Sequence, residues 1–461
     1  MLMGLAAGCT HAKDRPAAAP ATAVAVARPV VPVAAPDPEP APHLPSPTLA
    51  GWSMQFDAPA LKAPDGKVAL VTALAVPLYA APDAKRVIGY SGIGSTLPAK
   101  PARGRGCSEG WLAVSGGAYL CAGDGAKLID PPQRDRVLGA LGRARAPMLS
   151  RPNPYVYGKA RKGAFLLARP PRNSELSGLT AGKPARALDA QALNGTYLLS
   201  VVGKQEPGAG GPYVRTFRGR YLPAADFKRF PDAPMHGEHL GKRVKLPLAF
   251  TYRPTQVYCL GGESGGACGI ADKHARFPAG ATVERDRREL VMVGENLAVP
   301  RVDVRIARRV EKPAAVPEAE RWIHIDLSEQ TLVAYQGNKP VYATLVSSGR
   351  PGHDTPTGLF DVTRKYLTKV MNGHDDEGPY SVQEVPWTMY FHGNYAVHGA
   401  YWHDVFGHTR SHGCVNVPPV DARWLFYWSR PHLPAGWTAM LAAHGMHVYV
   451  TGKTPPEEEG T

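Results

Sequence analysis

Residues 322–347 read WIHIDLSEQTLVAYQGNKPVYATLVS, and this stretch decides the fold class. Its first six residues alternate in polarity as a half-buried strand does, and TLVAY continues as a second strand. Gly337-Asn338 is a hairpin-turn signal, and VYATLVS supplies the returning strand. The pattern predicts an antiparallel sheet at the start of a C-terminal domain that spans residues 321–452.

One helix is expected further along this domain. The segment PPVDARWLFYW, residues 418–428, has proline at its start, where a helix tolerates it. Trp424 and Trp428 are four positions apart and therefore share one helix face. The helix follows soon after Cys414, so it can fix the position of the residues around that cysteine.

Short strand-like runs separated by turn signals precede this domain. Those in residues 51–130 include a hairpin from Trp111 to Cys121 and resemble a bacterial SH3-like domain. A similar cadence recurs in residues 150–310, which predicts one or two further SH3-like modules. Residues 311–320 then form a linker into the C-terminal domain.

Composition and charge exclude several classes of protein. The 461 residues include 53 Lys and Arg against 39 Asp and Glu, a net charge of +14. This charge favours polyanionic surroundings. The chain has no basic helix interleaved with aromatic residues and no zinc-finger spacing, so we do not expect nucleic-acid binding. It also lacks the apolar run of about 18 residues that a transmembrane helix needs.

The N-terminus, MLMGLAAGC, ends in small residues directly before Cys9. Residues 1–9 resemble a bacterial lipoprotein signal in which the cysteine is acylated, although the usual positive start is missing. Thr10 favours the outer membrane over the inner one by the same resemblance. Residues 10–50 are rich in Ala and Pro and predict a disordered tether, and residues 453–461 a disordered tail. We therefore expect a periplasmic protein anchored by lipid to the outer membrane.

The six cysteines support export. Two pairs close in sequence suit local disulfides in an oxidising compartment, Cys107 with Cys121 and Cys259 with Cys268. Zinc is the competing interpretation, but neither pair has the tight spacing of zinc ligands. With Cys9 acylated, Cys414 is left as a thiol that is either reactive or buried.

The run SHGCVN, residues 411–416, carries the chemistry. A solitary cysteine near a histidine is a candidate nucleophile, because the imidazole can lower the thiol pKa or take its proton. Gly413 permits a tight backbone before the sulfur, and the amides of Gly413 and Cys414 could face an oxyanion. An inert buried thiol is the alternative.

These residues resemble the L,D-transpeptidase catalytic family of the YkuD type. The resemblance covers about residues 322–450 and rests on several motifs: Ile325-Asp326-Leu327, Ser347-Ser348-Gly349, TPTGLF at 355–360, Met389-Tyr390-Phe391, His398-Gly399 and SHGCVN at 411–416. It implies a mainly β architecture, with SH3-like small barrels followed by a β-sandwich-like catalytic domain that has a few helices.

The resemblance also implies a mechanism. Cys414 would attack the carbonyl of the third residue of a peptidoglycan tetrapeptide stem and expel the terminal D-alanine. An amine of a neighbouring stem would then attack the thioester and cross-link the wall. His398 would be the base, oriented by the carbonyl of Gly399, while His412 and Gly413 would complete the catalytic set. The resemblance implies no cofactor, and it implies that carbapenem-type β-lactams acylate Cys414.

Four further residues are candidate substrate contacts: Arg410, Ser411, Tyr390 and Asn416. Arg410 also fits a plain solvated charge. Three nearby histidines, His392, His403 and His408, could in principle join a zinc site, but the spacing gives no ligand geometry. We expect no metal and interpret these three as surface or lid residues. The polar segment 364–386 is either a lid over the cleft or a flexible loop.

The acyl acceptor is not encoded in a readable motif. Water as acceptor would make the protein an L,D-carboxypeptidase or amidase, and a protein lysine would make it a ligase that attaches proteins to peptidoglycan. A hypothesis from another class is a non-catalytic wall-binding scaffold whose SH3-like modules bind peptide stems. The intact SHGCVN motif favours an enzyme.

Overall fold

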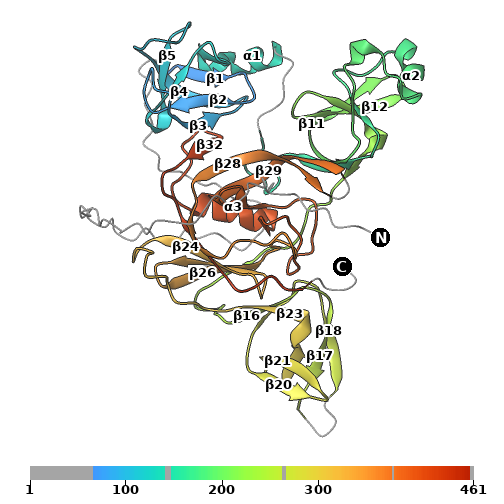
Figure 1. Cartoon of the computed structure of the whole chain (residues 1–461), viewed down its shortest axis with the longest axis vertical. Helices are drawn as coiled ribbons and strands as arrows, with labels where there is room; N and C mark the ends of the chain where they lie inside the picture. The colour runs from blue at the N-terminus through green and yellow to red at the C-terminus, as the bar shows by residue number, and fades with distance from the viewer. Residues whose placement is uncertain (1–65, 141–146, 262–265, 376–377, 457–461) are drawn as a thin grey trace, which may run out of the picture.

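The computed structural model describes residues 66–140, 147–261, 266–375 and 378–456. Strands dominate and helices are few (Figure 1), so the prediction of a mainly β protein is confirmed. Cys9, the tether at 10–50 and the chain end at 457–461 lie outside the described residues. Within the described ranges no helix has the length and apolar character needed to cross a membrane.

The C-terminal region is built on two sheets, one of which has six strands. It begins with the hairpin expected from residues 322–347: Ile325 pairs with Leu332, and Gly337 takes φ 55° in the turn. The strands in order across the sheet are β15 (Glu238–His239), β26 (Lys339–Leu345), β25 (Thr331–Gln336), β24 (Arg321–Asp326), β33 (His447–Thr451) and β27 (Gly358–Asp361).

The second sheet of this region faces the first across the predicted helix, α3 (Pro419–Trp428). Trp424 stacks on Tyr342 of β26 at 4.4 Å between ring centroids, while Phe426 lies 5.6 Å from Trp387 of the second sheet. The helix therefore fills the core between the sheets. The strands are β32 (Ala439–Leu441), β28 (Arg364–Asp375), β29 (Gly378–His392), β30 (Tyr395–Gly399) and β31 (Val415–Val417).

The prediction of a flexible loop over residues 364–386 is wrong. Residues of β28 and β29 pair from Arg364 with Tyr390 to Asp375 with Gly378 in one long antiparallel hairpin. The segment resembled a loop because it carries many polar residues. β28 alternates between buried and more exposed positions, and β29 buries polar residues such as Gln383 and Glu384. A lid role for the hairpin stays a prediction.

The first N-terminal module consists of short antiparallel strands. Its third strand pairs with β32, Tyr90 against Ala439, so the module extends the second sheet of the C-terminal region. The strands are β1 (Val68–Val71), β2 (Val76–Tyr79), β3 (Val87–Ser91), β4 (Thr96–Ala102), β5 (Trp111–Val114), β6 (Ala118–Cys121) and β7 (Ala126–Ile129), followed by α1 (Arg134–Ala140).

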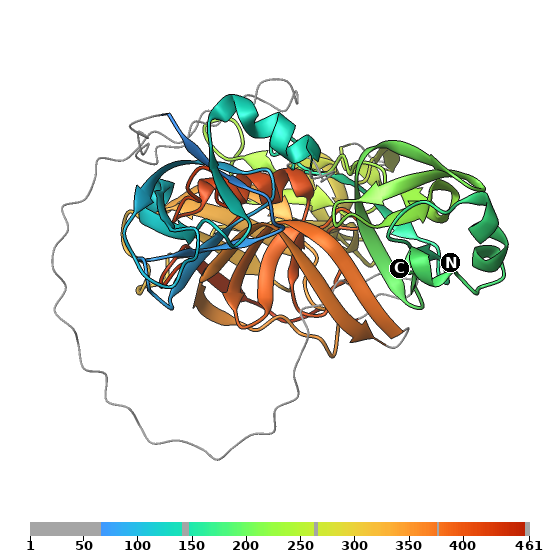
Figure 2. The same cartoon turned by 90° about the horizontal axis from the view of Figure 1, so that it is seen from above.

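The second module also joins this sheet. Its longest strand runs parallel to β29, with Leu198 opposite Val382. Both modules lie at the same end of the C-terminal region (Figure 1), and from above they stand to the left and right of the β28–β29 hairpin (Figure 2). The elements are β8 (Val156–Ala160), β9 (Phe165–Leu166), α2 (Asn173–Thr180), β10 (Gln191–Ala192), β11 (Thr196–Gly208), β12 (Gly211–Thr216), β13 (Tyr221–Pro223) and β14 (Phe227–Arg229).

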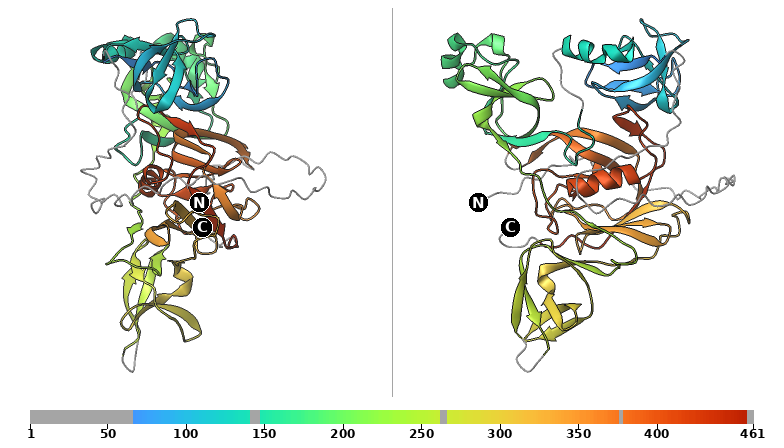
Figure 3. Two further views of the ribbon diagram at one scale, coloured as in Figure 1. Left: turned by 90° about the vertical axis from the view of Figure 1, so that its left-hand side faces the viewer. Right: turned by 180° about the vertical axis from the view of Figure 1, so that it is seen from behind.

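The third module lies at the end of the molecule away from the other two (Figure 3). Arg301 and Arg308 both contact Glu329 of the C-terminal region at 2.6 Å, and these ion pairs fasten the module there. The strands are β16 (Leu248–Thr251), β17 (Thr255–Cys259), β18 (Ala267–Ala271), β19 (Arg276–Pro278), β20 (Thr282–Arg285), β21 (Arg288–Gly294), β22 (Leu297–Pro300) and β23 (Val304–Ala307).

The three modules share one local feature, a strand that passes through a short 3-10 turn into the next strand. The turns are Ser115–Gly117, Ala224–Asp226 and Arg301–Asp303. The strand-turn-strand pattern that recurs in the sequence thus corresponds to a recurring backbone feature. The SH3-like class of these modules and the domain boundaries stay predictions.

Candidate active site

Cys414 lies just before β31, which runs parallel to β30. The register places His398 of β30 opposite Asn416 of β31. Because side chains alternate along a strand, positions 414 and 416 face the same side, and His398 faces that side as well. Both Cys414 and His398 are fully buried. The fold therefore places the predicted base on β30 and the predicted nucleophile directly before the neighbouring strand β31.

The backbone before the sulfur requires glycine. Gly413 has φ 111°, a conformation that other residues rarely adopt, and a Cβ there would collide with the ring of Tyr395. The carbonyl of Gly413 accepts a hydrogen bond from Thr355 Oγ1 at 2.8 Å. The same hydroxyl accepts the amide of Gly349 at 3.0 Å, so Thr355 ties the cysteine loop to the neighbouring segment.

Residues after β26 hold the cysteine loop from its other side. The backbones of Ser347 and Asn416 exchange two hydrogen bonds of 2.9 Å. The carbonyl of Ser348 accepts the amides of Arg410 and Ser411 at 2.8 and 3.0 Å. The Ser348 amide in turn donates to the side chain of Gln330 at 2.8 Å. Position 414 is thus fixed from both flanks.

His398 has the tautomer that a general base needs. Its Nδ1 lies 3.3 Å from the carbonyl oxygen of Gly399, and a carbonyl can only accept, so the proton resides on Nδ1. Nε2 is buried and has no hydrogen-bond partner among the described residues. Burial lowers the pKa of His398 to about 4, against a smaller opposing effect of the Gly399 carbonyl. The imidazole is therefore neutral at pH 7 and can accept a proton at Nε2.

The structure differs from the sequence interpretation at the sulfur itself. The sequence left Cys414 as an unpaired thiol, whereas the described residues contain no free cysteine and Cys414 is disulfide-bonded. Its Sγ also lies 3.7 Å from the carbonyl oxygen of Asn394. Only a thiolate is a nucleophile, so any chemistry at this residue belongs to the reduced protein.

The expectation that the Gly413 amide faces a developing oxyanion is wrong for this structure. That amide donates to Ser411 Oγ at 3.0 Å, and the Ser411 hydroxyl donates to the carbonyl of Cys414. Ser411 is fully buried and uses its hydroxyl within the loop. It closes the turn around the cysteine, and a contact with substrate stays a prediction.

His403 is half-buried, not the exposed surface residue that we expected, and a lid role stays a prediction. Its Nδ1 receives the amide of Val405 at 3.3 Å, and its Nε2 lies 2.9 Å from the side-chain amide of Asn416. Burial, together with the positive charge of Arg410, lowers its pKa to about 3. Asn416, a candidate substrate contact, is itself fully buried and held by His403.

His412 lies at the meeting point of three segments. Its Nε2 is 3.3 Å from the guanidinium of Arg350, and its ring stacks on Tyr380 of β29 at 5.7 Å between centroids. His353 makes an edge contact with it at 4.5 Å. The long hairpin of β28 and β29 therefore does reach the predicted site, at His412.

The remaining candidates lie around this centre in different environments. Arg410 is half-buried, and desolvation lowers its pKa. Tyr390 is buried, with the Arg364 guanidinium 4.3 Å from its ring centroid. His392 is exposed, as expected of a surface residue, whereas His408 packs against Tyr252 at 4.7 Å. The face of the Tyr390 ring is thus in contact with the Arg364 guanidinium.

Both predicted disulfides are confirmed, Cys107–Cys121 and Cys259–Cys268. These four cysteines are therefore not zinc ligands. In the part of the chain that the structure describes, no group of three or more His, Cys, Asp and Glu side chains is placed to hold a metal ion.

Sequence reasoning missed the residues that hold the cysteine loop. Thr355, Gln330, Arg350 and Tyr395 contact it or its supports, although Thr355 stands within a motif quoted for the family. These residues are far from Cys414 in the sequence or belong to no motif around it, so nothing in the sequence indicates directly that they contact the loop. A polar residue beside a glycine motif, such as Thr355, is the one available clue, because a buried hydroxyl needs partners.

Comparison with known proteins identifies the class of this region. Residues 320–450 match the family model of the L,D-transpeptidase catalytic domain, YkuD. These residues therefore form a catalytic domain of the L,D-transpeptidase family, as the sequence resemblance predicted. The match includes the strands from β24 to β32, α3 and the SHGCVN loop, and it ends within β33. No curated protein matches the chain.

Similar solved structures come from Enterococcus faecium. A cysteine-to-serine mutant of its L,D-transpeptidase is 25% identical, with 29% of this chain and 50% of that chain covered and a TM-score of 0.24. Its catalytic domain is 27% identical, with 29% and 98% covered and a TM-score of 0.24. The same domain acylated by ertapenem is 28% identical, with 28% and 99% covered and a TM-score of 0.22. The chain thus spans half the length of the first of these.

Proposed function

We propose that this protein is a peptidoglycan L,D-transpeptidase in which Cys414 is the nucleophile and His398 the base. The observation that carries the proposal is the neutral, buried His398 on the strand next to Cys414. Its proton is on Nδ1, and its Nε2 has no hydrogen-bond partner among the described residues. A thiol and a proton acceptor positioned together form an activated nucleophile. The family match of residues 320–450 supports the same reaction class.

In the proposed reaction, Nε2 of His398 takes the thiol proton and Sγ of Cys414 forms a bond to the carbonyl carbon of the third stem residue. The peptide C–N bond to the terminal D-alanine breaks, and the imidazolium returns its proton to the leaving amine. A thioester remains. An uncharged amine of a neighbouring stem attacks its carbonyl carbon, the C–S bond breaks, and the proton lost by the amine restores the thiol.

The same chemistry extends to inhibitors. The thiolate would attack the strained amide of a carbapenem, open the ring and keep the acyl group as a thioester. No cofactor takes part in either reaction. The catalytic domain of the Enterococcus faecium enzyme has been solved acylated by ertapenem.

We further propose that the protein works in the periplasm, anchored by lipid at Cys9 to the outer membrane. Disulfides persist in oxidising compartments, and Cys107–Cys121 and Cys259–Cys268 are consistent with export. Peptidoglycan peptide stems would then be its partners. Metabolic labelling with a fatty acid, with and without the change Cys9→Ser, tests the anchor.

Product analysis tests the proposed function. The reduced full chain is incubated with disaccharide-tetrapeptide, and the products are analysed by mass spectrometry. We expect a dimer that has lost one D-alanine, and no dimer from the Cys414→Ala variant. Tripeptide monomer alone would make the protein a hydrolase. Unchanged substrate would exclude the transpeptidase and leave the ligase and scaffold hypotheses.

A further inference from the structure

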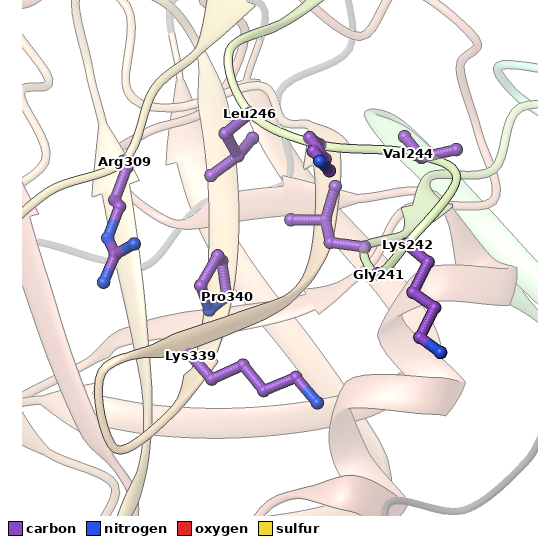
Figure 4. Close-up of a pocket in the computed structure, with 9 residues that line it drawn as sticks. Gly241, Lys242, Val244, Leu246, Arg309, Lys339 and Pro340 are labelled. Carbon is purple, nitrogen blue, oxygen red and sulfur yellow. The ribbon is translucent and has the colours of Figure 1, made fainter.

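A cavity of about 500 Å³ lies between residues 240–246, Arg309 and the start of β26 (Figure 4). Four cations line it, and no carboxylate does: Lys242, Lys245, Arg309 and Lys339. Its other lining residues are mainly apolar: Leu240, Val244, Leu246 and Pro340, with Gly241. We call this site the basic cavity.

The basic cavity is separate from the proposed active site. Lys339 begins β26, and the chain runs through this strand to Ser347, which pairs with Asn416 beside Cys414. Eight residues of extended strand span about 25 Å. A ligand in the basic cavity would therefore not contact Cys414.

The lysines of the basic cavity have no ionic partner in the part of the chain that the structure describes. Among the described residues, no carboxylate lies within ion-pair distance of Lys242, Lys245 or Lys339, and all three side chains belong to exposed residues. The Arg309 guanidinium donates to the carbonyl of Asn338 at 3.1 Å. The carboxylate of Glu318, which Asn338 also contacts, is paired with Lys312 at 3.5 Å.

Four positive charges around one concavity repel each other and raise its electrostatic potential, and this favours an anion there. We propose that the basic cavity binds a short acidic peptide, with its carboxylates on the cations and its aliphatic groups on the apolar floor. A volume of about 500 Å³ is within the range of small-ligand sites. The concave shape favours a discrete ligand over a membrane surface, and the apolar floor favours a ligand with a carbon skeleton over bare phosphate.

If the proposed function is correct, on which this step rests, the natural ligand is a peptidoglycan stem, which is a short peptide with free carboxylates. The basic cavity would then hold a stem that is not reacting. It would keep the polymer at the enzyme while Cys414 acts on another stem, which raises the effective concentration of substrate.

Binding of a fluorescent Ala-Glu-Ala-Glu peptide to the full chain tests the proposal. One variant carries Lys242→Gln, Lys245→Gln and Lys339→Gln. A matched control carries Lys67→Gln, Lys127→Gln and Lys228→Gln, which remove the same charge from exposed positions elsewhere. We expect the affinity to fall at least about tenfold in the first variant and less than twofold in the control, since only the first variant loses contacts between a charge and the peptide carboxylates.

The affinity should also fall as salt concentration rises. Equal weakening in both variants would assign the binding to net charge and overturn the proposal, as would the absence of binding to the wild type. Inorganic phosphate and vesicles of anionic lipid are tested as competitors. Displacement of the peptide by phosphate at equal concentration, or by vesicles alone, would overturn the peptide as ligand.

Two controls keep the result interpretable. Thermal unfolding of both variants shows whether they fold. Lysine acetylation followed by mass spectrometry should show protection of Lys242, Lys245 and Lys339 by the peptide, and no protection would contradict the site. Because these readouts measure binding, loss of thioester formation at Cys414 would refute the proposed function without affecting the acidic-peptide site.

Discussion

Arg305 of the third module donates a hydrogen bond from Nε to the carbonyl of Gly407, at 2.8 Å. Gly407 lies in the segment that links His398 to Cys414, and its amide donates to Val346 of the C-terminal region at 2.8 Å. The Arg305 guanidinium also lies 4.0 Å over the ring of Tyr252. A module outside residues 320–450 therefore supports the loop on which the proposed nucleophile depends.

The first prediction concerns this support. Arg305→Lys keeps the charge but loses the donor at Nε, so the loop shifts and turnover falls about tenfold, because small misplacements of reacting groups are costly. Steady-state kinetics with D-alanine release as the readout measures kcat and KM. The control is Arg287→Lys, an exposed position of the same module. Equal activity of the two variants would show that the module does not position the loop.

The second prediction concerns the pH dependence of the reaction. His398 loses its ability to accept a proton when it is protonated, and burial lowers its pKa to about 4. The acid limb of kcat/KM should therefore lie near pH 4, and the rate should not fall between pH 7 and 5.5. A fall with an apparent pKa near 6.5 would contradict a desolvated base. His398→Asn should lower kcat by about 100-fold or more.

The third prediction concerns acid stability. His324 is 3% exposed, its Nε2 lies 2.7 Å from Thr451 Oγ1, and burial lowers its pKa to about 4. In the unfolded chain this histidine takes up a proton near pH 6.5, whereas in the folded protein it does so only near pH 4. The free energy of unfolding is therefore unaffected by this group above pH 6.5 and falls as the pH drops from 6.5 towards 4. Between pH 7 and 4.5, His324 should lower the free energy of unfolding by about 2.5 kcal/mol.

His324→Gln should therefore reduce the acid-induced drop in the free energy of unfolding, measured by urea unfolding at pH 7 and 4.5. His392→Gln, at an exposed histidine, serves as the control and should leave the drop unchanged. If the His324 variant loses as much stability in acid as the wild type, this assignment of the pH dependence is wrong.

The fourth prediction concerns Lys365, which is almost completely buried. Its Nζ donates to the carbonyls of Phe426, Ser429 and Pro431 at 2.7, 3.1 and 3.1 Å. These carbonyls lie at the C-terminus of α3, where backbone acceptors lack helical partners. Lys365→Met leaves them unpaired, so the free energy of unfolding should fall by about 2–3 kcal/mol.

The sign of the pH effect separates this role from simple packing. Burial lowers the pKa of Lys365 to about 7. In the unfolded chain Lys365 keeps its proton up to about pH 10.5, whereas the folded protein loses it above pH 7. This group should therefore raise the free energy of unfolding of the wild type by about 2 kcal/mol between pH 7 and 9. The Met variant should lack that rise. An equal rise in both proteins would assign it to another group.

The sequence predicted the parts of the fold whose signal is local. Alternation and a Gly-Asn turn predicted the hairpin of β24, β25 and β26, and proline with spaced tryptophans predicted α3. Cysteine spacing predicted both disulfides. The long hairpin of β28 and β29 was missed, because β28 has a partly exposed face and β29 buries polar residues such as Gln383 and Glu384. Such a segment resembles a polar loop until its pairing is known.

In the candidate site, too, the residues with a local sequence signal were predicted and the others were not. The residues of SHGCVN and His398 were found by motif, and the Gly399 carbonyl is in fact beside His398 Nδ1. The hydrogen bonds within the loop could not be predicted. The Ser411 hydroxyl accepts a hydrogen bond from the Gly413 amide, and the side chains of His403 and Asn416 are hydrogen-bonded to each other. Ser411 and Gly413 are only two positions apart, but no pattern along the chain shows which acceptor the Gly413 amide uses. His403 and Asn416 come from separate segments, and their contact depends on how the chain folds.

The central claim is that Cys414 becomes acylated by the stem peptide. The direct measurement is mass spectrometry of the proteolysed, reduced full chain after an acid quench of its reaction with disaccharide-tetrapeptide. The account predicts that the peptide containing Cys414 gains the mass of the disaccharide-tripeptide acyl group, and that this adduct is lost in His398→Asn. D-alanine release without any adduct at Cys414, or an adduct on another residue, would contradict it.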